Sequence, residues 1–232
     1  MTVREFDGAI AQAPGSRRSS TVRDWPLGLP ARVLRRIVQV HLFFPLLWLL
    51  TRPRVRGREN LVGISGPILF AANHNSHLDS ITVLRALPPS LRDRTAVAAA
   101  EDYFFHNRFT AAVTHLTVNG FPFARRGPIR KSLEYCDELV GRGWSLLVYP
   151  EGSRAHPGKI SEFKSGVGLM GVKLGVPVVP VRVRGLERVL PKGRSVPRPH
   201  RVEVQIGPPI TCAPDTPYSE ATRRVEEAVR AL

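Results

Sequence analysis

The chain contains few cysteines and few aromatic residues. Only Cys136 and Cys212 occur among its 232 residues, and they are far apart in the sequence. This number and spacing match neither a disulfide framework nor a metal-binding set, so a reducing compartment is expected. Aromatic residues make up 7% of the chain, which is little for a protein that stacks single-stranded nucleic acid on aromatic rings. The first ten residues lack a long apolar core, so no cleavable signal peptide is expected there.

Acidic residues are also scarce. The chain has 19 Asp and Glu against 34 Lys and Arg, which gives a formal net charge of +15. Such a charge favours anionic partners, either nucleic acid, anionic lipid headgroups or a phosphorylated substrate. Lysine is scarce beside arginine, while Ala, Pro and Gly are plentiful, so a bias in coding sequence is an alternative explanation for much of the excess.

The length suits one domain with two segments before it. Residues 1–29 are rich in Arg, Ser, Pro and Gly and predict a mobile or loosely docked basic arm. Residues 30–55 have apolar residues at helical spacing and predict a membrane-associating amphipathic helix. Residues 56–232 are expected to form the main domain.

The helical segment contains the longest apolar run, Ile37–Leu50. Fourteen helical residues span only about 21 Å, against a hydrocarbon core of about 30 Å. Pro45 interrupts the run, and arginines flank it on both sides. This pattern favours a helix that lies in the headgroup region. The main alternative is a core helix of a soluble domain, and a spanning helix is favoured least.

Short apolar runs alternate with amphipathic ones beyond residue 58, which predicts an α/β domain with a mostly parallel central sheet flanked by helices. The expected strands are Pro67–Ala72, Thr95–Ala99, Leu116–Phe121, Ser145–Tyr149, Val176–Val183 and Arg201–Ile206. The expected helices are His77–Ala86, Phe104–Thr114, Ile129–Val140, Gly166–Leu174 and Ser219–Leu232.

One expected strand leads directly into a histidine and an aspartate. His74 follows the first apolar run, and Asp79 comes five residues later. If a helix begins near Ser76, the carboxylate of Asp79 can face back toward His74, fix its tautomer and leave Nε2 free to accept a proton. The alternative for Asp79 is a helix-capping box with Ser76. A metal site with His77 lacks further ligands at suitable spacing.

A second polar segment, Glu151-Gly152-Ser153-Arg154, follows another expected strand. Arg154 is suited to grip a phosphate, and Gly152 allows close approach of the backbone. Glu151 is expected to orient Arg154 or to bond substrate hydroxyls. The alternative is a turn closed by a local ion pair. Lys164 opens an expected helix, which also suits an anion.

A third segment, Asn119–Arg126, is a short apolar run that ends in two arginines. Arg125 is a further candidate for a phosphate contact, although Arg126 next to it has the same chemistry. A solvated strand end is the alternative.

Taken in order, these segments resemble the motifs of the glycerophospholipid acyltransferase family, which includes 1-acylglycerol-3-phosphate acyltransferases. The segments that match the four motifs are Asn73–Asp79, Gly120–Arg125, Pro150–Arg154 and Val176–Val181. Ser153 stands where the family has Thr, and Ala100 stands where the family often has a basic residue. The resemblance covers roughly residues 56–210.

The resemblance implies a general-base role for His74, with Asp79 as its orienting partner. It also implies that Arg125, Glu151, Gly152 and Arg154 bind the acceptor, and we place Ser153 and Lys164 in the same candidate substrate site. The implied reaction moves a fatty acyl group from acyl-CoA or acyl carrier protein to the free hydroxyl of 1-acylglycerol-3-phosphate. Another lysolipid or a glycolipid is the alternative acceptor.

A thioester donor is already activated, so no metal or other cofactor is expected. No serine or cysteine is clearly placed to form an acyl-enzyme, and Ser76 is the nearest. The implied location is the cytoplasmic face of a membrane, with the enzyme held on an anionic lipid surface as a peripheral or monotopic protein. A basic protein that binds membrane or nucleic acid without catalysis is the rival from another class, but such a protein has no use for His74 beside Asp79.

Overall fold

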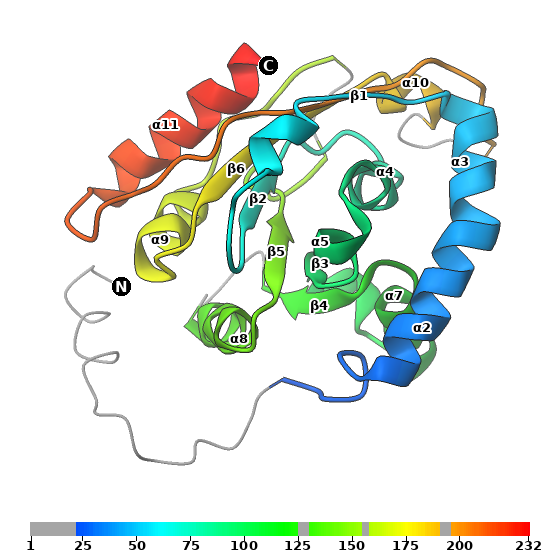
Figure 1. Cartoon of the computed structure of the whole chain (residues 1–232), viewed down its shortest axis with the longest axis horizontal. Helices are drawn as coiled ribbons and strands as arrows, with labels where there is room; N and C mark the ends of the chain where they lie inside the picture. The colour runs from blue at the N-terminus through cyan, green and yellow to red at the C-terminus, as the bar shows by residue number, and fades with distance from the viewer. Residues whose placement is uncertain (1–21, 125–129, 155–157, 191–195) are drawn as a thin grey trace.

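The computed structural model of the chain describes residues 22–124, 130–154, 158–190 and 196–232 (Figure 1). The strands are β1 (Arg54–Arg56), β2 (Leu69–Ala72), β3 (Thr95–Ala100), β4 (Gly120–Phe123), β5 (Ser145–Val148), β6 (Val178–Arg184) and β7 (Glu203–Ile206). The N-terminal helical elements are α2 (Leu29–Val38), a π-helical turn η1 (Gln39–Phe43), α3 (Phe44–Thr51) and the 3₁₀ turn η2 (Arg58–Leu61). The remaining helices are α4 (Asp79–Ala86), α5 (Pro89–Arg92), α6 (Glu101–Phe104), α7 (Arg108–Val118), α8 (Arg130–Gly141), α9 (Gly166–Lys173), α10 (Leu186–Val189) and α11 (Tyr218–Ala231).

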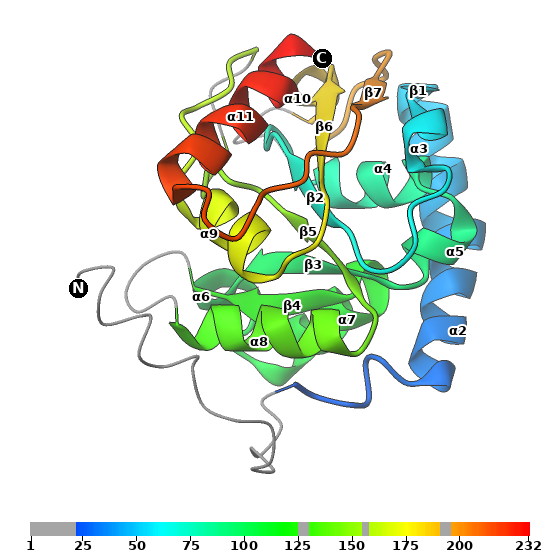
Figure 2. The same ribbon diagram turned by 60° about the vertical axis from the view of Figure 1, so that its left-hand side comes forward.

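The described strands form a seven-stranded sheet in the order β1-β7-β6-β2-β5-β3-β4. Every neighbouring pair is parallel except β6 with β7, which is antiparallel. Helices cover both faces of the sheet, with α8, α9 and α11 on one side and α4, α5 and α7 on the other (Figures 1 and 2). The predicted fold class, a mostly parallel α/β sheet flanked by helices, is therefore confirmed.

The central strand β2 is buried on both faces because its successive side chains point to opposite sides of the sheet. Leu69 and Ala71 pack in the core beneath α8, α9 and α11. Phe70 and Ala72 pack in the other core, beneath α4. All four side chains are fully buried. The strand β2 is therefore held firmly, and it fixes the position of the following segment, which carries His74, at the carboxyl end of the sheet.

The sequence pattern locates six of the described strands, but it misses β1 (Arg54–Arg56) and contains an error at Leu116–Val118. These residues were expected to begin a strand, but they form the last turn of α7. Gln39 donates to the backbone oxygen of Thr117 at 2.7 Å, so a contact from the N-terminal helix holds this turn. Asn119 then ends the helix in the left-handed conformation, with φ 54°, and the strand begins at Gly120. Short apolar runs of this kind fit either a helix or a strand, and tertiary contacts decide between them.

The N-terminal helix runs from Leu29 to Thr51 without a break. It is longer than the apolar run that predicted it, and by length and composition it could cross a membrane. Pro45 does not end the helix. Proline has no backbone N–H to donate, so one helical hydrogen bond is missing. The π-helical turn η1 before Pro45 keeps the helix continuous, since the N–H of Phe44 donates to the backbone oxygen of Gln39.

In this helix polar side chains face the domain and apolar side chains face outward, which is the reverse of a helix that packs on a soluble core. Its buried polar residues Arg35 and Gln39 face the domain, where they donate to the backbone oxygens of His115 and Thr117 on α7. Most of its large apolar side chains are exposed, and these are Leu29, Val33, Leu34, Ile37, Val40, Leu42, Leu46, Trp48 and Leu49. The alternative of a soluble core helix is therefore wrong, and a possible membrane-associating helix is present.

The expected basic arm, residues 1–29, lies mostly outside the described residues. Its described end, residues 22–28, is docked on the domain. Val22 is buried in the core, and its N–H donates to Glu138 on α8 at 3.3 Å. Asp24 forms an ion pair with Arg142 at 2.6 Å. This part of the arm therefore fixes the start of the N-terminal helix.

Candidate active site

The two polar segments singled out in the sequence meet at the carboxyl end of the sheet. β2 and β5 are parallel neighbours, and Ala71 lies opposite Val148. Their carboxyl ends therefore lie side by side, which is where parallel α/β sheets place their sites. β6 lies on the other side of β2, so three strand ends surround the turn that carries His74.

His74 and Asp79 form the predicted pair. Nδ1 of His74 lies 2.8 Å from Oδ2 of Asp79. The Asp79 side chain is completely buried, whereas the His74 side chain is 23% exposed. Because Nδ1–H donates to the carboxylate, Nε2 carries the free lone pair. The imidazole is therefore held by one nitrogen and is open to a reactant through the other.

One half of the capping-box alternative for Asp79 is present, and it involves the same oxygen atom; the other half is not, because the N-cap residue of α4 is Leu78 and the Ser76 hydroxyl accepts from the N–H of Leu78. Oδ2 accepts from the backbone N–H groups of Asn75 at 2.6 Å and Ser76 at 2.8 Å. Asp79 is the first residue of α4, where a negative charge is favoured by the helix dipole. The local fold thus places the carboxylate, and the carboxylate in turn places His74.

Ser76 does not fit the role of a nucleophile. Its side chain is fully buried. Its hydroxyl donates to the backbone oxygen of Leu190 and accepts from the N–H of Leu78. A substrate carbonyl cannot reach it without displacing these contacts.

Glu151 has partners other than those expected. Its Oε1 accepts from the backbone N–H of His74 at 2.7 Å, and its Oε2 accepts from the N–H of Ser161 at 2.7 Å. Burial raises the pKa of Glu151, while the two backbone donors act in the opposite direction. The carboxylate therefore ties the end of β5 to the turn that carries His74, instead of orienting Arg154.

Gly152 and Lys164 come together in space although they are distant in sequence. Gly152 has φ +72°, and a side-chain carbon there would lie 2.7 Å from Nζ of Lys164. The N–H of Lys164 also donates to the backbone oxygen of Pro150 at 3.0 Å. A glycine is required at this position, both for the backbone conformation and for the lysine that crosses over it.

Arg154 is half-buried and makes no ion pair with the residues that the structure describes. Its charge reaches the turn that carries His74, because the pKa of His77 is lowered first by burial and then by Arg154 and His74. The local ion pair that was the alternative for this segment is not found among the described residues. Ser153 is exposed beside it. Arg125 and Arg126 lie outside the described residues.

Comparison with known proteins places this arrangement in a family. The sequence model of the Acyltransferase family matches residues 52–184, which is more than half of the chain and includes both polar segments. The chain belongs to the acyltransferase family.

Named relatives agree with this assignment. The chloroplastic 1-acyl-sn-glycerol-3-phosphate acyltransferase LPAT1 of Arabidopsis thaliana is 30% identical over 179 residues, which cover 75% of this chain and 48% of that protein. The chloroplastic enzyme BAT2 of Brassica napus is 29% identical over 149 residues, which cover 60% of this chain and 39% of that protein. The chain thus spans about half the length of these curated relatives, or less.

A solved structure resembles nearly the whole chain. It is the crystal structure of the 1-acyl-sn-glycerophosphate (LPA) acyltransferase PlsC from Thermotoga maritima. The TM-score is 0.67 at 25% identity, and the match covers 92% of this chain and 82% of that one. The likeness therefore includes more than the segment that the family model matches.

Sequence reasoning missed Tyr149 as part of the candidate site. Its ring stacks on the His74 imidazole, with centroids 4.3 Å apart and planes 26° from parallel. Its hydroxyl bonds Ser80 on α4 at 2.9 Å. Tyr149 thus restrains the plane of the imidazole by stacking, while Asp79 restrains its Nδ1 by a hydrogen bond. The feature of the sequence that could have identified Tyr149 is its position directly before the Pro150–Arg154 motif.

Asn73 was identified in the sequence only as part of a motif. In the structure its side chain connects β2 to β6. Its side-chain amide donates to the backbone oxygen of Val183 at 2.9 Å and accepts from the N–H of Val183 at 2.7 Å. The two bonds continue the β2–β6 pairing beyond the end of β2. They hold the residue before His74 against β6.

Proposed function

We propose that the chain is an O-acyltransferase that moves a fatty acyl group from a thioester donor to the free hydroxyl of 1-acylglycerol-3-phosphate, which forms phosphatidic acid for phospholipid synthesis. The observation that carries the proposal is the 2.8 Å contact between Nδ1 of His74 and the buried carboxylate of Asp79. The names of the relatives, which are 1-acyl-sn-glycerol-3-phosphate acyltransferases, support this acceptor. Another lysolipid or a glycolipid is the second candidate acceptor.

The chemical step uses the free nitrogen of His74. Nε2 removes the hydroxyl proton as the alcohol oxygen attacks the thioester carbonyl carbon. The carbon–sulfur bond then breaks, and the departing thiolate takes the proton from the imidazolium. Asp79 stabilises the positive charge that His74 carries in between. General-base catalysis of this kind contributes about 10²- to 10⁴-fold in rate.

The acceptor phosphate is assigned to the cations beside Gly152. Arg154 and Lys164 have no ion-pair partner among the described residues, and both lie on the segment that follows β5, next to the turn of His74. Arg125 and Ser153 stay candidates from the motif. Glu151 acts through the backbone of His74, so we assign it a positioning role.

Purified protein supplied with an acyl-CoA is expected to release thiol when lysophosphatidate is added, with phosphatidate as the product in mass spectrometry. Arg154→Gln should raise the KM for lysophosphatidate about tenfold or more, since a charge-assisted hydrogen bond is worth about 1.5–3 kcal/mol. Arg224→Gln, on an exposed residue of α11, is the matched control.

No thiol release with any lysolipid, from either acyl-CoA or acyl carrier protein, would instead favour a basic binding protein without catalysis. Release with a different lysolipid or a glycolipid would keep the chemistry and change the acceptor.

We also propose that the enzyme lies on the cytoplasmic face of the membrane as a monotopic protein. The N-terminal helix exposes apolar side chains along its length, from Leu29 to Leu49, and α7, against which it packs, exposes Phe109 and Val113 as well. Because Arg35 and Gln39 bond the helix along its side to α7, a helix that crossed the bilayer would carry polar parts of the domain into it. A helix lying in the headgroup region avoids this cost.

Replacing Leu42 and Leu49, which are 59% and 62% exposed, with glutamate is expected to lower binding to phosphatidylglycerol-containing vesicles at least tenfold, because each leucine contributes about 1.5–3 kcal/mol when buried. Co-sedimentation measures this. Val62→Glu changes a side chain that is 81% exposed elsewhere, and it should leave binding unchanged. Equal vesicle binding by all three proteins would rule out the helix as the membrane contact.

A further inference from the structure

A cavity of about 440 Å³ lies beside the catalytic turn and is not used by the mechanism above. Its walls come from β1, β6, α10, the start of β7 and the segment after Gly158. Seven cationic side chains line it, namely Arg54, Arg56, Lys159, Arg182, Arg184, Arg188 and Arg201. Only two acidic residues, Glu187 and Glu203, line it as well.

The positive charge of this cavity is largely unneutralised. Glu203 pairs with Arg56 at 3.1 Å, and Glu187 accepts from the backbone N–H of Gly185 at 2.9 Å. The other six cations form no ion pair with the residues that the structure describes. Like charges this close repel one another, and the charge of Arg184 helps to lower the pKa of Arg182 after the larger effect of burial. Such a cluster does not help the chain to fold, but it is suited to bind a ligand that carries several phosphate groups.

The cavity reaches the catalytic turn through Asn73 and Asn75, the two neighbours of His74, both of which line it. Asn75 is 9% exposed, and its Oδ1 has no hydrogen-bond partner in the described part of the chain. A buried acceptor without a partner is rare in folded proteins. It is suited to accept from an N–H group of a ligand that extends from the arginines toward His74.

Cationic groups therefore flank the imidazole in two separate places. One is formed by Arg154 and Lys164 after β5, and the other is the cavity at β1, β6 and β7. The reaction needs two phosphate-bearing substrates, and the first place is assigned to the acceptor. We infer that the cavity binds the phosphates of the coenzyme A donor, with its pantetheine amides passing Asn75 toward His74. This inference rests on the proposed function.

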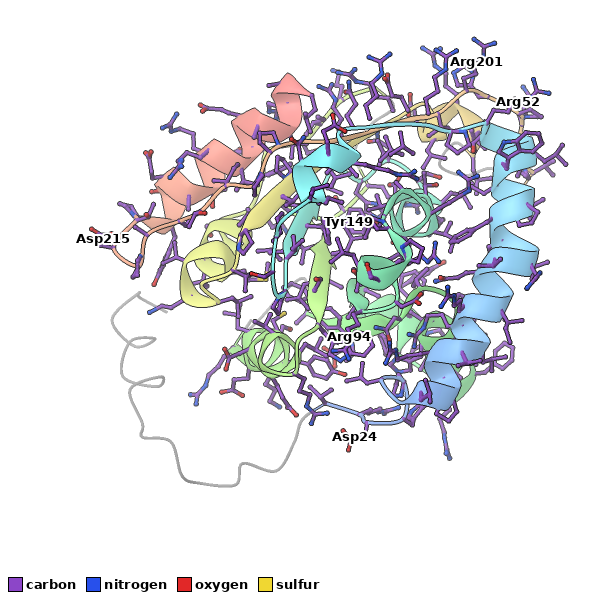
Figure 3. The ribbon with its side chains drawn as sticks, viewed as in Figure 1. Asp24, Arg52, Arg94, Tyr149, Arg201 and Asp215 are labelled. Atoms are coloured by element: carbon purple, nitrogen blue, oxygen red, sulfur yellow. The ribbon has the colours of Figure 1, made fainter. Side chains whose placement is uncertain are left out.

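The number of the cations favours coenzyme A over a carrier protein. Coenzyme A carries a pyrophosphate and a 3′-phosphate, whereas the arm of a carrier protein has a single phosphodiester. Six of the seven cations of the cavity are exposed, as is Arg52 at the end of the N-terminal helix, so the headgroup of an anionic lipid can reach them as well. Arg201 lies at the same end of the molecule as Arg52 (Figure 3), so the membrane surface has to be tested as a rival.

The test compares wild type, Arg184→Gln/Arg201→Gln and the control Arg224→Gln. Calorimetry with free coenzyme A measures binding without any acyl transfer. The double variant is expected to weaken coenzyme A binding, and to raise the KM for acyl-CoA, at least about tenfold, with kcat within about twofold. The KM for the matching acyl-pantetheine, which lacks the phosphates, should not change.

The following outcomes, except the last, overturn the inference. Wild type that does not bind coenzyme A, or a double variant that binds it normally, removes the cavity as the donor site. A higher KM for lysophosphatidate alone assigns the cavity to the acceptor, and weaker vesicle binding alone assigns it to the membrane. Acyl transfer from carrier protein but not from acyl-CoA also contradicts it. Normal coenzyme A binding without transfer to any lysolipid rejects the proposed function and leaves the donor site standing.

Discussion

Replacement of His74 with alanine is expected to lower kcat for acyl transfer by about 10²- to 10⁴-fold, with little change in the KM for either substrate. The imidazole is the only group on the catalytic turn that is bonded to a buried carboxylate and still exposed to a reactant. Without it, the acceptor hydroxyl must lose its proton to water as it attacks. Thiol release from acyl-CoA, followed at saturating lysophosphatidate, measures the loss.

The matched control for this substitution is His77→Ala. His77 lies on the same turn, is exposed and stacks on Tyr103 with ring centroids 6.1 Å apart. It has no carboxylate partner in the described structure, so its removal should change kcat by no more than a few fold. Thiol release by His74→Ala at the wild-type rate would remove the general base from the mechanism. Thermal unfolding of His77→Ala should stay close to wild type, whereas His74→Ala should lose some stability, because it removes one hydrogen bond to the buried carboxylate of Asp79.

Substitution of Asp79 with asparagine is expected to lower kcat by a similar factor and also to destabilise the fold. Three N–H groups converge on Oδ2, from His74, Asn75 and Ser76. A neutral amide accepts more weakly, and its NH₂ group would favour the tautomer of His74 that has no proton on Nδ1. In serine proteases the equivalent change costs about 10⁴ in kcat because the wrong tautomer is held.

The loss of stability comes from the burial of Asp79. Its side chain has no exposed surface, and hydrogen bonds to a buried charge are worth about 1.5–3 kcal/mol each. Denaturant unfolding should therefore show a loss of about 2–4 kcal/mol. Asp137→Asn, on an exposed residue of α8, should change neither quantity. If Asp79→Asn kept full activity while it lost stability, Asp79 would be a helix cap only.

Some of the site was predictable because it is local in sequence. His74 and Asp79 are five residues apart, and the strand before them and the helix after them were both evident from apolar periodicity. A turn between such elements has few conformations, so the carboxylate of Asp79 could be expected to face the imidazole. The same holds for the Tyr149–Arg154 segment at the end of β5, although not for the partners of its side chains.

The N-terminal helix shows where local reasoning fails. The sequence predicted a membrane-associating helix over residues 30–55, with arginines flanking its apolar run. The structure contains a helix over Leu29–Thr51, in which Arg35 faces the domain and bonds the backbone of His115 and Pro26. A charged side chain in an apolar stretch looks like a solvent-facing residue in the sequence. Only the packing of α2 on α7 reveals that it turns inward and leaves the apolar face outside.

The sequence by itself determined the alternation of strands and helices, the His74–Asp79 pair and the family motifs, because each depends on residues close together in the chain. Tertiary structure decided the order of the strands. That order places β5 and β6 on either side of β2, and so it brings Glu151 to the backbone of His74, Tyr149 to its ring and Val183 to Asn73. Strand order follows from how the helices pack on the two faces of the sheet, and no local pattern encodes it.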